Sequence, residues 1–130
     1  MTGGHMLLLM TALLVAQTAP VEPEQAEIVV IGQRLSHWTG KYAIRGAKLR
    51  CATKTSSGDG EIDAVGCKAF DICADQLSSR ITESDDKSLP KESRFSLKEG
   101  IKRDLSSCVA DQRVMLIAKL ADHRSAMKNN

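Results

Sequence analysis

The residues with the most specific chemistry in this chain are its four cysteines, Cys51, Cys67, Cys73 and Cys108. In an oxidising compartment, four cysteines in a small domain are typical of two disulfides, and three pairings are possible. A zinc site would need closer pairs such as C-x2-C, or histidines beside the cysteines. Cys67 and Cys73 are separated by six positions, and His37 and His123 lie near neither of them in the sequence. We therefore expect two disulfides and no metal site.

The acidic residues Asp59, Glu61 and Asp63 alternate in a way that resembles a calcium-binding loop. An EF-hand would place glycine after Asp63 and glutamate at the twelfth position, where this chain has Phe70. Helix capping explains the cluster better. Asp59 can accept hydrogen bonds from the first N–H groups of a helix, and the two acidic residues that follow suit the positive end of its dipole. The cluster therefore predicts a helix start.

We find no pattern that predicts catalysis. The chain lacks a G-x-S-x-G motif and a glycine-rich phosphate loop, and the expected disulfides use every cysteine. His37 and His123 lie near opposite ends of the expected domain. We therefore expect a protein that is not an enzyme, with no catalytic residues and no cofactor.

The N-terminal part of the chain predicts export from a bacterial cell. Residues 6–16 (MLLLMTALLVA) form an apolar run that has the length of a signal-peptide core and is too short to span a bilayer. Small residues at Ala16 and Ala19 suit cleavage, which predicts a signal peptide over residues 1–19 and a periplasmic or secreted protein. An uncleaved anchor is the alternative, and either Met1 or Met6 could be the true start. Residues 20–26 (PVEPEQA) predict a flexible linker, and residues 27–130 one small domain.

A β segment is expected at the start of this domain. The stretch EIVVIGQRL, residues 27–35, contains four consecutive β-branched residues and predicts a strand. Residues 41–44 and 47–53 alternate in the manner of strands, with Tyr42 and Ile44 in one and Leu49 and Cys51 in the other. Together they predict a hairpin across Arg45 and Gly46.

Two helices are expected to follow. Apolar residues recur at helical spacing over residues 61–78, while the polar residues 79–92 predict a loop that could contain a helical turn. Ser96 and Glu99 have the spacing of a capping box, which predicts the start of a long second helix. The expected fold is α+β and mostly helical, with two or three N-terminal strands followed by two packed helices.

The helical pattern also favours one disulfide pairing. Cys73 and Cys108 each lie on the apolar side of their helix, so a bond between them would join the two helices. The remaining pair, Cys51 and Cys67, would join the last strand to the first helix. The pairing of Cys51 with Cys73 and Cys67 with Cys108 is the second choice. A bond between Cys67 and Cys73 is the third, because they lie on different sides of one helix.

The β segment is strongly basic although the whole chain carries a formal net charge of only +2. It contains six basic residues and no acidic residue between Glu27 and Asp59: Arg34, Lys41, Arg45, Lys48, Arg50 and Lys54. These charges could simply keep a sheet edge in solvent. They could also form a face that attracts an anionic partner such as lipid A, membrane headgroups or a polyanion.

Segments of this sequence resemble two groups of known proteins. The segments EIVVIGQRL, HWTG and CATKTSSGDGEIDAVGCKAFDIC, followed by Cys108, resemble a group of small uncharacterised secreted proteins of α-proteobacteria of the sphingomonad type. That resemblance implies export and disulfides but no reaction. EIVVIGQR is also similar to the EIVVTG segment near the mature N-terminus of TonB-dependent outer-membrane receptors, with Ile31 in place of threonine. The second resemblance implies either a TonB-like contact strand or a plain strand.

Three functions remain open from the sequence. The first is a structural or binding module that acts through an unknown protein partner in the periplasm. The second is an envelope-associated module that binds anionic lipid or polysaccharide through the basic face. The third is an inhibitor-like protein that blocks a hydrolase with the loop at residues 54–60. No nucleic-acid partner is expected, and the oligomeric state is open.

Overall fold

A computed structural model gives the structure of the protein, and it describes residues 22–45 and 48–130. Over these residues the chain forms four helices and one two-stranded antiparallel sheet. The elements are α1 (Pro23–Leu35), β1 (Thr39–Arg45), β2 (Lys48–Thr55), α2 (Gly60–Gln76), α3 (Ser78–Ser84) and α4 (Lys91–Lys128). The predicted class, α+β and mostly helical, is confirmed. The predicted signal peptide at 1–19 lies outside the described residues.

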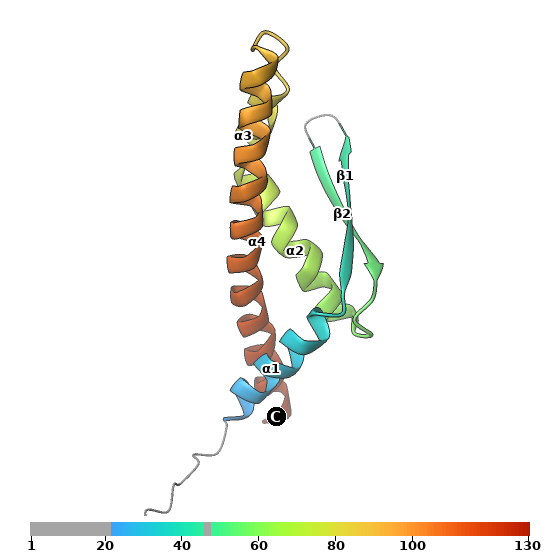
Figure 1. Ribbon diagram of the computed structural model, residues 1–130. Coiled ribbons are helices and arrows are strands. Elements are labelled where there is room, and N and C mark those ends of the chain that lie inside the picture. Colours follow the sequence, from blue (N-terminus) through green and yellow to red (C-terminus); the bar gives the residue numbers. More distant parts are fainter. Residues whose placement is uncertain (1–21, 46–47) are drawn as a thin grey trace, which may run out of the picture.

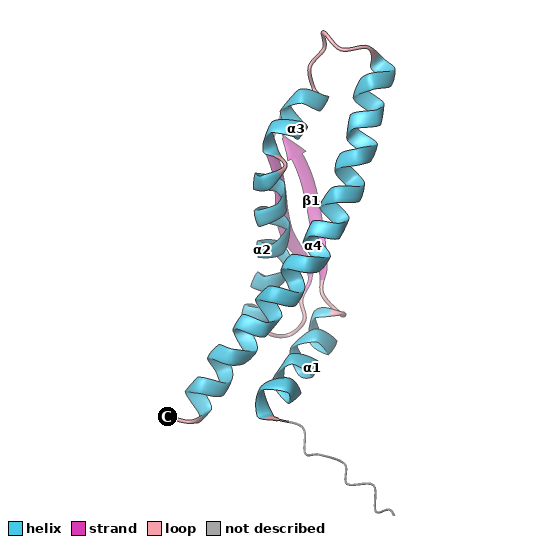
Figure 2. Cartoon of the chain, turned by 90° about the vertical axis from the view of Figure 1, so that its left-hand side faces the viewer, coloured by secondary structure: helices cyan, strands magenta, loops and turns pink. Residues whose placement is uncertain are grey.

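The elements are arranged around the long helix α4 (Figures 1 and 2). Its 38 residues correspond to a length of about 57 Å. Helix α2 crosses α4, α3 packs against its N-terminal part, and α1 packs against its C-terminal part. The hairpin of β1 and β2 packs on α2. From their base, the two strands run toward the N-terminal end of α4 (Figure 1).

The first predicted strand, at residues 27–35, is wrong, because these residues belong to α1. The predicted linker at 20–26 is also wrong in part, since α1 begins at Pro23. Proline suits the first turn of a helix, where its missing N–H group has no intrahelical partner. Ile28, Ile31 and Leu35 then fall on one side of the helix and pack in the core. Burial of this stripe outweighs the preference of β-branched residues for strands.

The predicted hairpin is confirmed, and both of its strands extend beyond the predicted bounds. Tyr42 pairs with Cys51 and Ala43 pairs with Arg50, in antiparallel register. A β-bulge interrupts the ladder where Thr39 pairs with Thr55 and Gly40 pairs with Thr53. The turn at Gly46 lies outside the described residues.

Helix α2 begins where the acidic cluster predicts. The Asp59 carboxylate accepts hydrogen bonds from the N–H groups of Glu61 at 3.0 Å and Ile62 at 3.3 Å, so Asp59 is the N-cap. Gly58 precedes the cap with a φ of 86°, in the left-handed region that glycine enters at little cost.

The helical turn that the sequence allowed in the predicted loop at 79–92 is present as the short helix α3 (Ser78–Ser84), which is longer than a single turn. Ile81, its single large apolar residue, is buried beside α4. The predicted capping box does not start α4. This helix begins at Lys91, directly after Pro90, and passes through Ser96 without a break. Proline restricts the backbone of the residue before it, which makes Pro90 the stronger boundary signal.

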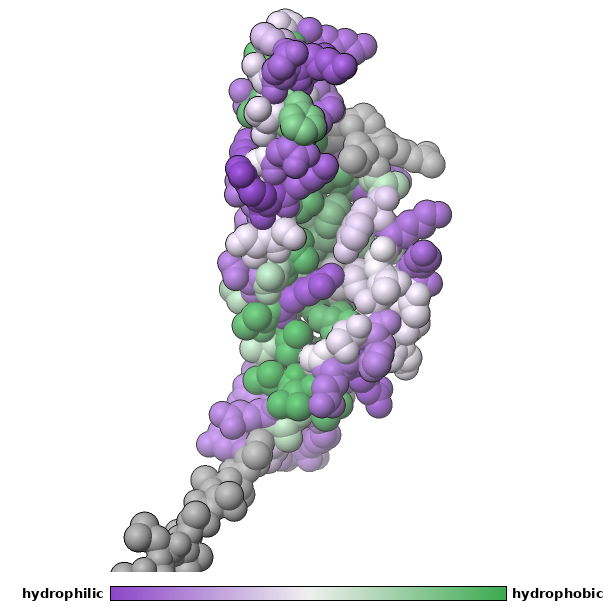
Figure 3. Space-filling model, in the orientation of Figure 1, coloured by the Kyte–Doolittle hydropathy of each residue, from purple (hydrophilic) through white to green (hydrophobic). Residues whose placement is uncertain are grey.

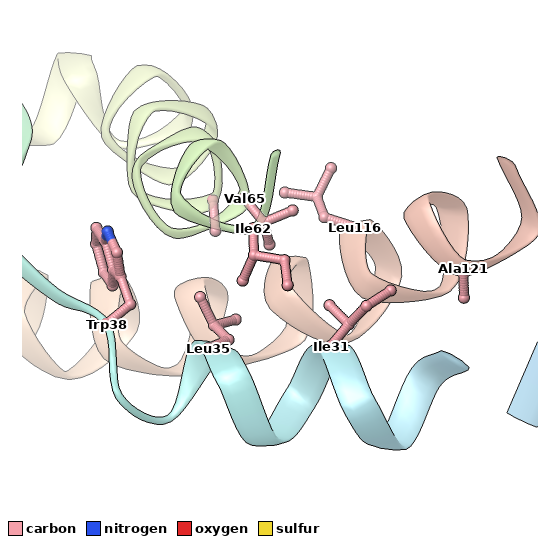
Figure 4. Close-up of a cluster of buried hydrophobic side chains, with 8 residues drawn as sticks. Ile31, Leu35, Trp38, Ile62, Val65, Leu116 and Ala121 are labelled. Carbon is pink, nitrogen blue, oxygen red and sulfur yellow. The ribbon is translucent and has the colours of Figure 1, made fainter. Parts of the chain in front are cut away.

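The core lies where α1, α2 and α4 meet (Figure 4). Side chains from the three helices point toward one another there: Ile31, Leu35, Ile62, Val65, Leu116 and Ala121. Trp38, which follows α1, extends this cluster to the base of the hairpin, where its Nε1 donates a hydrogen bond to Thr53 Oγ1 at 2.9 Å.

Both favoured disulfides are present. Cys73 of α2 bonds to Cys108 of α4, with 5.9 Å between their Cα atoms, and joins the two helices. Cys51 of β2 bonds to Cys67 of α2, with 5.5 Å between their Cα atoms, and joins the hairpin to the helical body. All four cysteines are therefore oxidised, which is typical of proteins outside the reducing cytoplasm.

Candidate functional site

The two faces of the hairpin differ sharply in chemistry. Side chains alternate between the faces of a strand, and residues that pair across strands share a face. The inner face is fixed by Tyr42, whose ring stacks on Phe70 of α2 at 4.5 Å between centroids, and by Cys51, which is bonded to α2. The alternate positions therefore form the outer face, which points away from α2.

The outer face contains only basic residues and alanines among the positions whose side chains are described. Lys41 pairs with Ala52 and Arg50 pairs with Ala43, while Lys48 lies nearer the hairpin turn. All of these side chains are exposed, and Lys54 is exposed beside the bulge. We call Lys41, Lys48, Arg50 and Lys54 the basic face. The side chain of Arg45, which pairs with Lys48 through the backbone, lies outside the described residues.

The basic residues of the hairpin and Arg34 differ in whether a carboxylate lies close to them. No carboxylate of the described residues lies within 4.0 Å of the cationic nitrogens of the basic face. Arg34, which the sequence grouped with this face, lies on α1 instead, 3.8 Å from the Asp59 carboxylate. Asp71 and Asp75 of α2 line a shallow hollow beside Lys48 and Arg50, so they reduce the positive potential along that one edge.

On its inner side, the hairpin forms one wall of an open groove whose other wall is α4. The groove has a volume of about 690 Å³, and Phe70, Leu105 and Val109 supply much of its apolar lining. It meets a smaller pocket of about 210 Å³ at the shared residues Leu49, Lys102 and Leu105. We call the two together the apolar groove. Figure 3 shows hydrophobic side chains gathered between α4 and the hairpin.

The cations along the apolar groove differ in their partners. Lys98 pairs with Asp85 at 3.3 Å, and Lys102 pairs with Glu99 at 3.1 Å. Arg113 has no carboxylate within 4.0 Å among the described residues, and its buried Nε has no hydrogen-bond partner there. Its guanidinium lies 5.4 Å from the centre of the Trp38 ring. At the groove, Arg113 therefore offers a buried Nε donor that no described residue uses.

The loop at residues 54–60 is rich in serine because it binds an acidic side chain. The Asp63 carboxylate accepts hydrogen bonds from the Ser56 hydroxyl at 2.5 Å, the Ser57 hydroxyl at 2.6 Å and the Ser57 N–H at 2.8 Å. These bonds favour the charged carboxylate and hold the pKa of Asp63 below its ordinary value. Asp63 thus fixes the loop that connects the hairpin to α2.

A second ionic contact joins the N-terminus of α2 to the C-terminal part of α4. Arg124 donates hydrogen bonds to Asp59 at 2.7 Å and to Glu61 at 3.2 Å. Burial opposes ionisation of Asp59, but the hydrogen bonds from Arg124 and from the N–H groups of Ile62 and Glu61 outweigh it, so the pKa of Asp59 is lowered. Arg124 therefore joins the C-terminal part of α4 to the N-cap of α2.

These features supply charge and apolar surface for binding. His37 and His123 are both exposed, and residues 22–45 and 48–130 contain no group of three histidine, cysteine, aspartate or glutamate side chains placed to hold a metal ion. In the same ranges no helix is long and apolar enough to cross a membrane. The sequence identified the basic residues, but it missed Arg113, whose only signal was a charged residue four positions after Val109 in the apolar stripe.

Comparisons of the chain with protein-family models, with curated proteins and with solved structures find no match. The resemblance to small secreted α-proteobacterial proteins therefore stays a prediction. The resemblance to TonB-dependent receptors implied a strand at residues 27–34, and the helix α1 contradicts that strand.

Proposed function

We propose that the protein is an exported binding module, periplasmic or secreted, that attaches to the anionic surface of the bacterial envelope through its basic face. The observation that carries this proposal is the strand register. Among the positions whose side chains are described, it presents Lys41, Lys48 and Arg50 together on one exposed face with only alanines between them. Short alanine side chains allow the cations to approach a flat surface of phosphate or carboxylate groups.

The mode of attachment follows from the composition of this face. A basic side chain near an anionic membrane surface contributes about 1 kcal/mol, so four of them together support measurable binding at low ionic strength. At its described positions the face offers no large apolar side chain for insertion into the lipid. Attachment through it is therefore electrostatic. Added salt weakens this attachment, because the Debye screening length is only about 10 Å at 0.1 M ionic strength.

The test is co-sedimentation with vesicles that contain phosphatidylglycerol, at low and high salt, with pure phosphatidylcholine vesicles as the neutral surface. Replacement of Lys41, Lys48, Arg50 and Lys54 by glutamine should weaken binding by about a hundredfold or more. A matched control removes the same charge elsewhere, from exposed cations outside the hairpin. Its four positions are Lys87, Lys91, Arg103 and Lys119.

The control variant should retain most of the binding. Equal losses in the two variants would show that net charge alone drives attachment and would reject the basic face as the site. Binding that persists unchanged at high salt would contradict the electrostatic mode. Competition by a soluble acidic polysaccharide, with no binding to vesicles, would assign the face to a polysaccharide surface instead of a lipid one.

A second candidate function, binding of a protein partner, is supported by α1. Val29 and Val30 are neighbouring apolar residues on this helix and remain 55% and 44% exposed. A photocrosslinking residue at Val29 should capture a specific periplasmic protein, and Val30→Asp should abolish that capture. Capture that survives Val30→Asp would exclude this surface. The inhibitor hypothesis for the loop at 54–60 stays a prediction.

A further inference from the structure

We infer that the apolar groove binds a fatty acid, with its carboxylate at Arg113 and its acyl chain along the groove toward α3. This inference goes beyond attachment through the basic face, because it concerns the opposite side of the hairpin. It rests on the volume and lining of the groove and on the Arg113 guanidinium, which has no carboxylate within 4.0 Å and no partner for its Nε among the described residues.

The groove has the dimensions and lining of a small-molecule site. Ligand pockets commonly measure about 300–1,000 Å³ and combine a mostly apolar lining with a few polar groups that orient the ligand. The main part of the apolar groove has about 690 Å³, lined by Tyr42, Phe70, Leu105 and Val109 among others. The adjoining pocket of about 210 Å³ continues it between Ile81 and Ile101. An extended acyl chain matches this elongated apolar path.

The charged residues along the groove indicate the kind of head group that the ligand has. Lys98 and Lys102 already pair with Asp85 and Glu99. Arg113 retains its donors, and a guanidinium binds a carboxylate through two parallel hydrogen bonds. Stacking on Trp38 holds the guanidinium at the groove. One available cation and one apolar path correspond to a ligand with one anionic group and one chain.

A fatty acid fits this arrangement better than an amphipathic peptide helix. A helix in a groove needs apolar anchors on successive turns and usually several charged contacts along the rim. Here the second and third cations of the rim are already paired, so a peptide would gain only the contact with Arg113. The hairpin backbone also closes one side of the groove, while an acyl chain needs no backbone partner.

Binding can be measured with cis-parinaric acid, a fluorescent fatty acid. Trp38 is the only tryptophan of the chain and lies beneath Arg113. Bound probe should therefore quench the Trp38 emission by energy transfer, and palmitate should displace the probe and restore that emission. Methyl palmitate, which lacks the charge, should displace it about tenfold less well, because a hydrogen bond between charged groups contributes about that factor.

Three variants locate the site. Arg113→Gln should remove the preference for palmitate over its methyl ester while leaving weak binding of both. Ser106→Phe places a ring in the groove from an exposed position of α4 and should weaken probe binding about tenfold or more, since it fills space that the chain would occupy. Val114→Phe is the matched control, because Val114 is 70% exposed and does not line the groove. It should bind like the wild type.

Several outcomes would overturn the inference. These are no displacement by palmitate, equal displacement by palmitate and its methyl ester, or equal binding by the Ser106→Phe and Val114→Phe variants. Displacement by an acidic amphipathic peptide but not by palmitate would assign the groove to a peptide. The variant without the basic face should still bind palmitate, and Ser106→Phe should still bind vesicles. A failure of either proposal is thereby separated from a failure of the other.

Discussion

The sharpest test of the described packing is the substitution Gly66→Ala in α2. Gly66 is buried against the indole of Trp38, and a Cβ atom at this position would lie 2.6 Å from Cε2 and 2.7 Å from Cδ2 of that ring. Carbon atoms do not approach this closely, so either the ring or the helix must shift. The indole cannot move freely, because Trp38 Nε1 is bonded to Thr53 Oγ1 and Gly40 packs on the same ring.

The net effect combines opposing contributions. Overpacking a filled core costs typically about 1–3 kcal/mol, and a broken hydrogen bond from the indole adds about 1 kcal/mol. Alanine favours a helix over glycine by about 1 kcal/mol, which offsets part of this cost. We therefore expect Gly66→Ala to lower the free energy of unfolding by about 1–3 kcal/mol.

Two other glycines provide matched controls. A Cβ atom at Gly32 of α1 would meet no atom within 4 Å, and one at Gly100 of α4 would lie 3.5 Å from the flexible end of Arg80. Only the gain in helix propensity applies there, so each alanine should stabilise the protein by about 0.5–1 kcal/mol. The same chemical change thus has opposite signs at different sites.

Urea unfolding followed by Trp38 fluorescence and by circular dichroism measures these changes. The cost of Gly66→Ala should also shrink in a Trp38→Phe background, where a smaller ring leaves room for the methyl group; that cycle is followed by circular dichroism alone. If Gly66→Ala stabilised the protein as much as Gly32→Ala, the indole would not lie on α2, and the described core at the base of the hairpin would be wrong.

Three further predictions concern the ionic contacts and the disulfides. A double-mutant cycle between Asp59 and Arg124, measured by urea unfolding, should give a coupling of about 1 kcal/mol, and a coupling of zero would contradict the contact. Because the pKa of Asp63 is lowered in the folded state, its contribution to stability is present above the ordinary pKa near 3.8 and is lost as the pH falls through the folded value. Asp63→Asn should therefore reduce the acid sensitivity of unfolding below about pH 4, and an unchanged pH profile would argue against the serine contacts. Replacing Cys73 and Cys108 by alanine should destabilise by about 4 kcal/mol and replacing the other pair by about 3 kcal/mol, because the bonds close loops of 35 and 16 residues; calorimetry that gave the reverse order would refute the loop-length argument.

The disulfides could be predicted from the sequence because helical periodicity alone places Cys73 and Cys108 on apolar stripes. Cys67 lies on another side of α2, which leaves it for Cys51. The cap at Asp59 was predictable for a similar reason, since its hydrogen bonds connect residues that are two and three positions apart. Both predictions rest on the spacing of residues within a helix, and that spacing can be read directly from the sequence.

Helix α1 could not be predicted from the same kind of signal. Its run of β-branched residues favours a strand, whereas the stabilisation that decides the matter comes from Ile31 and Leu35 in contact with distant helices. The groove cation Arg113 was hidden for the same reason. Its importance depends on the position of Trp38, which is 75 residues away in the sequence and is brought there by the hairpin and α2.

The hairpin connects the two proposals because its inner face lies on the helices while its outer face points away from them. Trp38, Thr53 and the disulfide of Cys51 fix its base to α2, while its strands run from there toward the N-terminal end of α4 (Figure 1). A strand pair held in this way presents both faces, and the alternation of side chains gives each face its own chemistry.

A one-residue change in register would exchange the two faces, placing Lys48 and Arg50 in the groove and Leu49 in solvent. The bulge beside Gly40 and the Cys51–Cys67 bond prevent such a shift. The residues that stabilise the base of the hairpin therefore also maintain the separation of the basic face from the apolar groove.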